Sequence, residues 1–133
     1  MSPPMPSLTI GPIGQAQVEA FALASGDANP LHVSPSIARE IGLESAPVHG
    51  MLLVAFLHEA VRRHRPQGMV VSLATRFMAP VFVGDTIEIS GRIVKTGTRE
   101  EPVTMRLFVK TNRGAVACMA EATIAPSPGG WTA

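Results

Sequence analysis

Apolar residues recur at helical spacing in the first half of the chain. Val18, Phe21 and Ala22 fall on one face of residues 15–25, and this spacing predicts a short amphipathic helix. Residues 51–64 are apolar on every side at first and become amphipathic only near the end of the segment. That pattern is typical of a helix whose first two turns are buried, so we expect this second helix to be the central one.

Capping signals predict a further short helix between these two segments. Ser34 is suited to the N-cap position, and Pro35 is suited to the first helical position, where a missing N–H leaves no bond unmade. Gly42 lies where a glycine commonly ends a helix. We therefore expect a helix that begins at Pro35 and stops just before Gly42.

From residue 69 onwards the period of the pattern changes to two, which predicts strands. One side of the alternation consists of Val71, Leu73, Thr75 and Phe77, then Ile87, Ile89, Gly91 and Ile93, then Val103, Met105, Leu107 and Val109. Asn112 to Gly114 predict a turn, and a last strand should run from residue 115 to about residue 124. With a short strand near residues 8–10, we expect about five strands.

Helices that precede a run of strands indicate an α+β fold, in which an antiparallel sheet carries the helices on one face. The chain has 133 residues, and two independent cores would leave each half too small for comfortable stability. We expect a single domain over residues 1–133. Its proline-containing ends, at about residues 1–7 and 126–133, are expected to be loosely ordered.

Composition and charge narrow the classes of partner. Hydrophobic residues make up 46% of the chain and charged residues 16%, which leaves apolar surface for a protein partner. A formal net charge of +1 gives no field that would attract nucleic acid or an anionic membrane, and the apolar run 51–57 is too short to span a bilayer.

Cys118 is the single cysteine, and its alternating apolar segment predicts packing in the core. The first residues lack the pattern of a secretory signal, so we expect the cytoplasm.

Asp27 and His32 are the residues with the strongest indication of chemistry. On one helix, a separation of five residues would turn the two side chains roughly 140° apart, and Pro30 would interrupt that helix. A loop therefore explains the segment better. A carboxylate and an imidazole held on one rigid loop are suited to proton transfer.

Three residues of the segment are expected to shape this loop. Gly26 permits unusual backbone angles, Asn29 can close a turn with its side chain, and Pro30 fixes one torsion. Each functional residue also has a structural alternative, in which Asp27 only organises the turn and His32 is a hydrogen-bonded residue of the core.

Residues 21–32, Phe-Ala-Leu-Ala-Ser-Gly-Asp-Ala-Asn-Pro-Leu-His, resemble the signature of the MaoC-like (R)-specific enoyl-CoA hydratases. Residues 47–53, Pro-Val-His-Gly-Met-Leu-Leu, and residues 76–85, which include Pro-Val-Phe-Val-Gly-Asp, resemble the same family, so the resemblance extends over most of the chain. It implies a hot-dog fold, a long curved sheet around one buried helix. It also implies at least a homodimer, with the substrate near the interface.

The resemblance further implies an activity and the roles of individual residues. The family interconverts trans-2-enoyl thioesters and (R)-3-hydroxyacyl thioesters, with CoA as part of the substrate and no separate cofactor. Asp27 and His32 would be the catalytic pair. Gly50 would donate its backbone amide to the thioester oxygen, supported by the positive end of the following helix. No metal is needed, and the histidine spacing does not resemble a metal site.

Several alternatives remain open at this stage. The same scaffold accommodates an acyl-carrier-protein dehydratase, a thioesterase or, in another class, a noncatalytic subunit that binds acyl thioesters. His49 could position the start of the helix, cap it or simply pack. For His58 a buried structural role is favoured over contact with the active site. Arg62, Arg63 and Arg65 could contact CoA phosphates, but a role at the helix C-terminus, with Arg63 paired to Glu59, is favoured.

Overall fold

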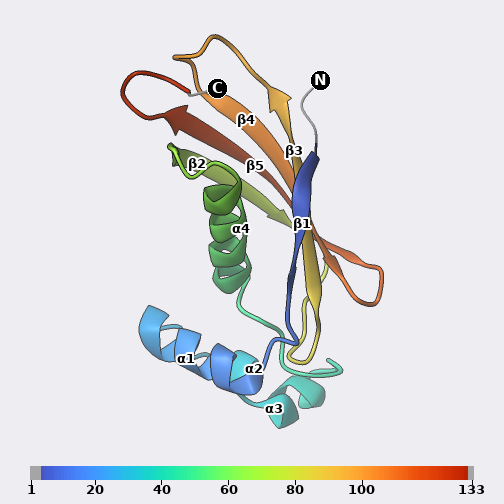
Figure 1. Ribbon diagram of the computed structural model, residues 1–133. Coiled ribbons are helices and arrows are strands. Elements are labelled where there is room, and N and C mark those ends of the chain that lie inside the picture. Colours follow the sequence, from blue (N-terminus) through green and yellow to red (C-terminus); the bar gives the residue numbers. More distant parts are fainter. Residues whose placement is uncertain (1–3, 132–133) are drawn as a thin grey trace.

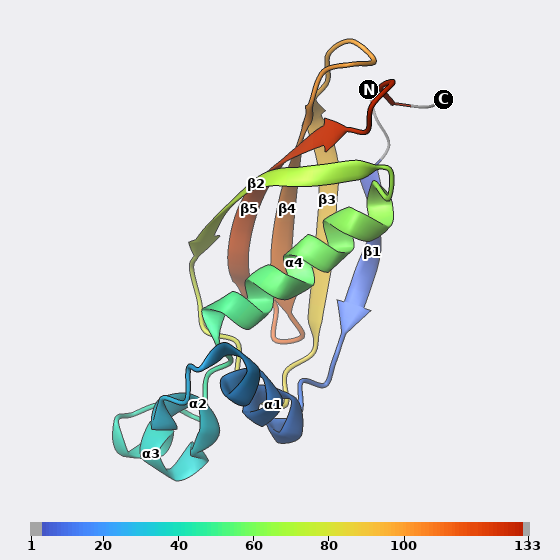
Figure 2. The same cartoon turned by 90° about the vertical axis from the view of Figure 1, so that its left-hand side faces the viewer.

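Five antiparallel strands form one curved sheet with a long helix on one face (Figures 1 and 2). The computed structural model describes residues 4–131. In spatial order the strands are β1 (Pro4–Ile10), β3 (Ile87–Lys95), β4 (Val103–Thr111), β5 (Val116–Pro126) and β2 (Gly68–Phe77). The helix is α4 (Gly50–His64), which crosses the sheet diagonally in Figure 2. The predicted α+β class and the central helix are therefore confirmed.

The core lies between α4 and the inner face of the sheet. Alternate residues of β3 and β4 are buried, as the period of two predicts, and they include Ile87, Ile89, Met105, Leu107 and Val109. The helix contributes Leu52, Leu53, Leu57, Ala60 and Val61 to the same cluster. Full burial of one large aliphatic side chain is worth about 1.5–3 kcal/mol, and any displacement of α4 would expose several of them. The contact with the sheet therefore fixes the position and direction of α4.

Strand β2 departs from the predicted alternation. The pairing of β2 with β5 shifts register between Val70 and Ser72, which marks a bulge. One extra residue reverses the side on which each following residue points. Val70 and Leu73 consequently pack on the core together, whereas Val71 is 53% exposed. The prediction that Val71 and Leu73 share a face was wrong for this reason.

Three short helices lie at one end of the sheet, beside the N-terminus of α4 (Figure 1): α1 (Gln15–Ser25), α2 (Pro30–Val33) and α3 (Pro35–Glu40). The helix predicted over residues 15–25 is confirmed. Ser34 caps α3 as expected, because its hydroxyl oxygen accepts from the Ile37 amide at 3.4 Å. Gly42 follows the helix with a φ of +94°, which favours glycine there.

Described residues within both segments that were expected to be loosely ordered make backbone hydrogen bonds to the rest of the chain. Residues 4–7, placed in a loose end, form the first half of β1, which pairs with β3. At the other end, the Trp131 amide donates to the Arg99 carbonyl at 2.8 Å, and the indole N–H donates to the Glu101 carbonyl at 2.9 Å. Residues 1–3 and 132–133 of the predicted loose ends lie outside the described residues.

Cys118 packs in the core, as predicted from the alternating pattern. Its side chain is fully buried and forms no disulfide. Burial raises the pKa of the Cys118 thiol to about 11, because the thiolate would lose its hydration. Within residues 4–131, no helix combines the length and apolar character required to cross a membrane.

Candidate active site

The segment with Asp27 and His32 joins two helices. Gly26 ends α1 with a φ of +79°, a conformation that suits glycine. Asn29 caps α2 through its side-chain oxygen, which accepts from the Leu31 amide at 3.0 Å. Pro30 is the first residue of α2, where a missing N–H costs nothing. His32 therefore lies on a short helix and not in the predicted loop, because Pro30 starts a helix here instead of interrupting one.

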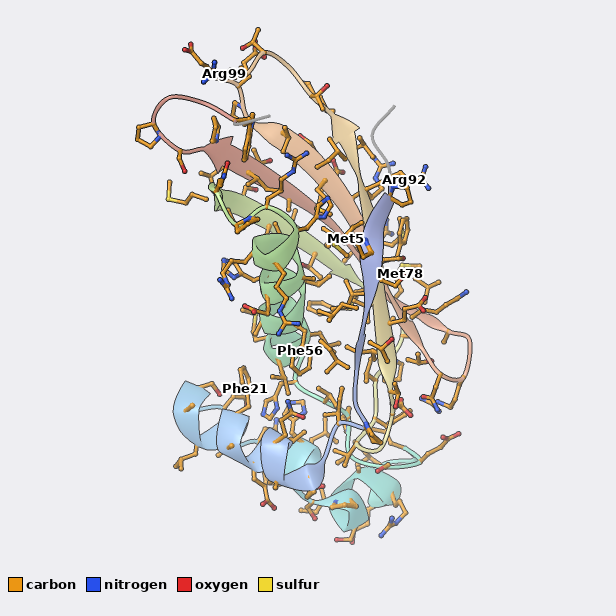
Figure 3. The ribbon with its side chains drawn as sticks, in the orientation of Figure 1. Met5, Phe21, Phe56, Met78, Arg92 and Arg99 are labelled. Atoms are coloured by element: carbon orange, nitrogen blue, oxygen red, sulfur yellow. The ribbon has the colours of Figure 1, made fainter. Side chains whose placement is uncertain are left out.

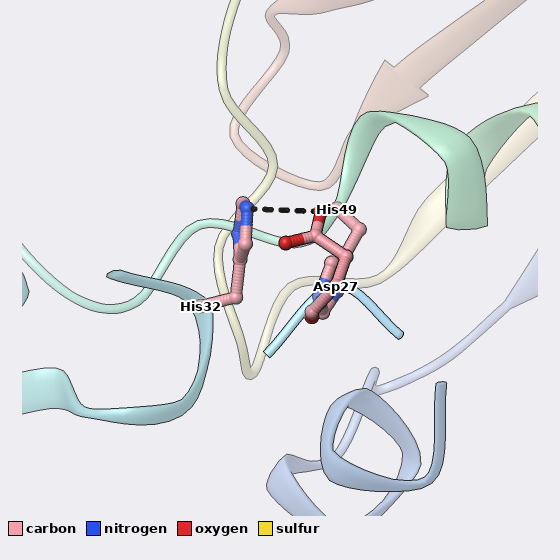
Figure 4. A group of neighbouring side chains, drawn as sticks. All are labelled: Asp27, His32 and His49. Carbon is pink, nitrogen blue, oxygen red and sulfur yellow. Dashed lines mark hydrogen bonds and ion pairs between the residues drawn. The ribbon is translucent and has the colours of Figure 1, made fainter. Parts of the chain in front are cut away.

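Asp27 and His32 face each other across a short gap (Figure 4). His32 Nε2 and Asp27 Oδ2 are 4.0 Å apart, which is too long for a direct hydrogen bond. The imidazole is 17% exposed and the carboxylate 54% exposed. The structure thus brings the predicted pair together at a distance that one water can bridge, with a hydrogen bond to each atom.

A backbone carbonyl fixes the orientation of His32. Its Nδ1 lies 2.8 Å from the carbonyl oxygen of Pro47. Because a carbonyl oxygen only accepts, Nδ1 carries the proton of this hydrogen bond. In the neutral ring, Nε2 is then a free acceptor directed toward Asp27.

His49 is the third side chain of the cluster, and it is 1% exposed. Its Nε2–H donates to the backbone carbonyl oxygen of Asp27 at 2.9 Å. The ring stacks on His32, with centroids 4.0 Å apart and planes inclined by 28°. Phe21, which points from α1 toward the beginning of α4 in Figure 3, contacts the same ring edge-on at 5.0 Å. The side chain makes no capping hydrogen bond to α4, so the capping alternative was wrong.

The stacked rings fit a metal ion poorly. Asp27, His32 and His49 each offer one possible ligand atom, and these three atoms lie within 4.8 Å of one another. Imidazole binds an ion through a lone pair in the ring plane, at about 2.0–2.1 Å for zinc. The lone pairs of two stacked rings lie in separate, nearly parallel planes, so a single ion does not lie in the plane of both rings. Nε2 of His49 also already donates to a carbonyl. The arrangement suits proton transfer better than metal binding.

The segment before α4 is held by the loop that precedes β3. Pro47 and Phe82 form an isolated antiparallel bridge. The Val48 amide donates to the Val81 carbonyl at 2.7 Å, and the Val83 amide donates to the Ala46 carbonyl at 3.0 Å. These bonds set the position of the Pro47 carbonyl, which in turn orients His32.

Asp85 anchors that loop. Its Oδ2 accepts from the Phe82 amide and from Nη2 of Arg113, both at 2.9 Å. Arg113 also reaches Glu44 at 3.1 Å and lies over the Phe82 ring. The segment 76–85, which carried part of the family resemblance, thus has a structural purpose: it braces the backbone that orients His32.

Gly50 is the first residue of α4, so its amide has no partner inside the helix. Its φ is not positive, and a tight turn therefore does not explain the glycine. An added Cβ would lie 3.1 Å from Cζ of Phe77, so a larger residue here would require the exposed Phe77 ring to shift by a few tenths of an ångström. A cavity of about 370 Å³ opens here, lined mainly by apolar side chains: Val48, Gly50, Leu53, Phe77, Met78, Ala79, Pro80 and Val81.

Two side-chain expectations on α4 have different outcomes. His58 is exposed on the side of the helix away from the core, so the favoured buried role was wrong. The predicted Glu59–Arg63 pair is confirmed at 3.0 Å, and Arg62 joins it at 2.8 Å. These two hydrogen-bonded guanidinium groups lower the pKa of Glu59 to about 2.

Sequence reasoning missed two determinants of the site. The Pro47 carbonyl could not be found, because a backbone acceptor has no sequence signature. The bond from His49 to the Asp27 carbonyl joins residues 22 positions apart and depends on the complete fold. The signal that was present is the position of His49 directly before Gly50 in a segment that resembled the family.

Comparison with known proteins agrees with the geometry. The family model described as "MaoC like domain" matches residues 3–114. The chain is 37% identical over 117 residues to an (R)-specific enoyl-CoA hydratase of Aeromonas caviae, and the match covers 84% of each protein. It is 39% identical over 83 residues to a mitochondrial 3-hydroxyacyl-acyl-carrier-protein dehydratase of Arabidopsis thaliana, a match that covers 62% of this chain and 49% of that relative.

The fold matches as well. A solved structure described as an (R)-hydratase from A. caviae involved in PHA biosynthesis superposes with a TM-score of 0.86 and 29% identity, over 94% of this chain and 95% of that chain. The expected hot-dog fold is therefore confirmed. The segment matched by the family model contains Asp27, His32, His49 and Gly50. On sequence and on structure, this chain belongs to the MaoC-like family.

Proposed function

We propose that this protein reversibly hydrates trans-2-enoyl-CoA to (R)-3-hydroxyacyl-CoA by acid–base catalysis at Asp27 and His32. The observation that carries the proposal is the 4.0 Å gap between Asp27 Oδ2 and His32 Nε2. Both atoms are acceptors when the carboxylate is ionised and the ring is neutral. The similarity to (R)-specific enoyl-CoA hydratases supports the same reaction.

A single water fits between these two acceptors. A water oxygen about 2.8 Å from each atom would span the 4.0 Å gap at an angle of roughly 90°, close to the angle between the two O–H bonds of water. Such a water donates one hydrogen bond to Asp27 and the other to His32. Its lone pairs then face away from the pair, toward the substrate.

The reaction follows from this placement. The water oxygen forms a bond to C3, and the electron pair of the C2–C3 double bond moves toward the thioester carbonyl to give an enolate. Asp27 and His32 together accept one proton from the water and return one proton to C2, so the enzyme ends in its initial protonation state. Dehydration is the same sequence in reverse.

The amide of Gly50 is suited to stabilise the enolate oxygen. It lies at the start of α4, where the free N–H groups and the helix dipole favour negative charge. The cavity beside Gly50 is lined mainly by apolar side chains, so an acyl chain bound there would displace water and strengthen this hydrogen bond. Loss of one such donor typically costs about 2.7–4 kcal/mol of transition-state stabilisation.

A panel of trans-2-enoyl-CoA substrates of different chain lengths tests the proposal. We expect loss of enoyl absorbance and an (R)-3-hydroxyacyl product. Asp27→Asn and His32→Ala should each reduce kcat by at least about 100-fold. Release of free thiol without hydration would indicate a thioesterase. Turnover confined to enoyl groups on acyl carrier protein would indicate the carrier-protein dehydratase, and binding without turnover would indicate a noncatalytic subunit.

We also propose that the protein is a homodimer that joins at the edge of β2. This strand pairs with β5 on one side and ends the sheet of the described residues on the other. Large apolar side chains are exposed along and beside it: Met69, Val71, Phe77 and Met78. An exposed apolar edge of this length favours pairing with a second copy. Paired sheets would place the cavity at Gly50 close to the interface.

Light scattering tests the assembly. Wild-type protein should have the mass of two chains, and Val71→Lys should shift the mass toward one chain. Leu23→Lys is the matched control, because Leu23 is an exposed apolar residue on α1, away from β2. A wild-type mass of one chain, or equal effects of the two variants, would contradict this interface.

Finally, we propose that residues 1–133 act as one domain in the cytoplasm. The chain contains one cysteine, so it cannot form the intrachain disulfide framework that is typical of oxidising compartments. The match to the A. caviae hydratase covers 84% of that protein's length, which supports one domain over the matched residues. Cell fractionation followed by immunodetection tests the location.

A further inference from the structure

We propose that His49 is a positioning residue for the hydration reaction: it holds Asp27 in place through the backbone and supports the ring of His32. The inference rests on the proposed function. It assigns His49 no contact with substrate, because its Nδ1 is enclosed and has no hydrogen-bond partner within residues 4–131.

The first observation concerns Asp27, whose carboxylate is 54% exposed. Its other hydrogen bonds are local: the Asp27 amide donates to Ser25 Oγ at 3.1 Å, and Oδ1 accepts from the Asn29 amide at 3.4 Å. Neither bond fixes the loop relative to the rest of the site. The bond from His49 Nε2 to the Asp27 carbonyl, at 2.9 Å, does so, because it joins the loop to the buried start of α4.

The second observation concerns His32. The ring of His49 covers one face of the His32 ring at a centroid distance of 4.0 Å. Pro47, two residues before His49, accepts the hydrogen bond from His32 Nδ1. One short segment, residues 47–49, therefore sets the positions of both members of the proposed pair. The 4.0 Å separation that the proposed water would bridge depends on this common support.

The side chain matches this task. His49 is 1% exposed, and Phe21 contacts its edge, so the ring has little freedom to rotate. Burial of a polar ring is unfavourable unless it makes a hydrogen bond. Here one nitrogen makes that bond to Asp27, and the other is left without a partner. A purely packed position would be filled better by phenylalanine, which leaves no polar atom unsatisfied.

Three variants separate the bond from the stacking. His49→Gln retains an N–H near the position of Nε2, whereas His49→Asn places its N–H near the position of Nδ1. His49→Phe retains a stacked ring without a donor. We expect His49→Gln to keep kcat within about tenfold of wild type, and the other two variants to lose about 100-fold in kcat with little change in KM. His64→Gln, at the far end of α4, is the matched control and should behave as wild type.

Thermal unfolding of each variant accompanies the kinetics. A merely structural His49 would lower the melting temperature while kcat per folded molecule stayed unchanged. A folded His49→Phe variant with wild-type kcat would overturn the proposal. Equal losses in His49→Gln and His49→Phe would overturn it as well, because the retained donor would then have no effect.

A readout independent of activity keeps this inference separate from the proposed function. In imidazole nitrogen NMR spectra of the wild-type protein, His49 should carry its proton on Nε2, with slow exchange, and His32 should carry it on Nδ1. If the protein hydrates no enoyl-CoA but these tautomers are found, the proposed function fails and the hydrogen bonds stand. If His49 carries its proton on Nδ1, the positioning role fails whatever the activity.

Discussion

Replacement of Asp85 should destabilise the protein and disturb His32 from a distance. Asp85 is 8% exposed, and its Oδ2 accepts from the Phe82 amide and from Arg113. In Asp85→Ala both donors lose their acceptor. In Asp85→Asn one oxygen remains for the Phe82 amide, while the charge that pairs with Arg113 is removed.

The magnitudes follow from the burial of each donor. The Phe82 amide belongs to a buried residue, so leaving it unpaired costs about 1–3 kcal/mol. The Arg113 side chain is 41% exposed and retains Glu44 as a partner, so its lost bond costs about 1 kcal/mol or less. We therefore expect a loss of about 1–4 kcal/mol for Asp85→Ala and about 1 kcal/mol or less for Asp85→Asn. For a domain of this size, each kcal/mol lowers Tm by roughly 3–5 °C.

Urea and thermal unfolding measure these losses, and kinetics measure the consequence at the site. At a temperature where Asp85→Ala is folded, kcat should fall more than KM rises, because the Pro47–Phe82 bridge shifts and His32 loses its orientation. Lys110→Ala, an exposed change on β4, is the control. An Asp85→Ala variant as stable as wild type would refute the reasoning.

Three further predictions concern single features. Asn29→Ala removes the cap of α2 and should lower kcat about tenfold in the enoyl absorbance assay, because His32 lies on that helix; unchanged kcat would be evidence against it. The raised pKa of Cys118 contributes stability that is fully present below about pH 9 and lost as pH rises through about 11. In urea unfolding, the free energy of unfolding of wild type should therefore fall toward that of Cys118→Ala over this pH range. Dialysis against EDTA should leave kcat unchanged, because the stacked rings of His32 and His49 suit an ion poorly; loss of activity restored by zinc would contradict this.

Much of the fold could be predicted from the sequence where local patterns and the core agree. The alternation of β3 and β4 matches their burial, and the apolar start of α4 matches its contact with the sheet. The bulge at Val71 could not be predicted, because an extra residue in one strand is defined only by the partner strand.

At the site, too, features within one segment could be predicted from the sequence, whereas contacts between distant segments could not. The proximity of Asp27 and His32 could be predicted because they lie in one compact motif, and Pro30 correctly excluded a single helix for both. The same proline begins α2, so His32 lies on a helical turn. The contacts that orient the pair, from Pro47 and His49, come from a segment brought close only by the folded chain.

The most direct test of the central claim is single-turnover hydration of a trans-2-enoyl-CoA by wild type, Asp27→Asn, His32→Ala and the double variant. Because the two side chains share one water, they act as a unit, and their effects should not add. We predict that each single variant loses at least about 100-fold and that the double variant is hardly slower than the slower single variant. Wild-type rates in both single variants, or a double variant whose loss is the product of the two, would contradict a shared water between Asp27 and His32.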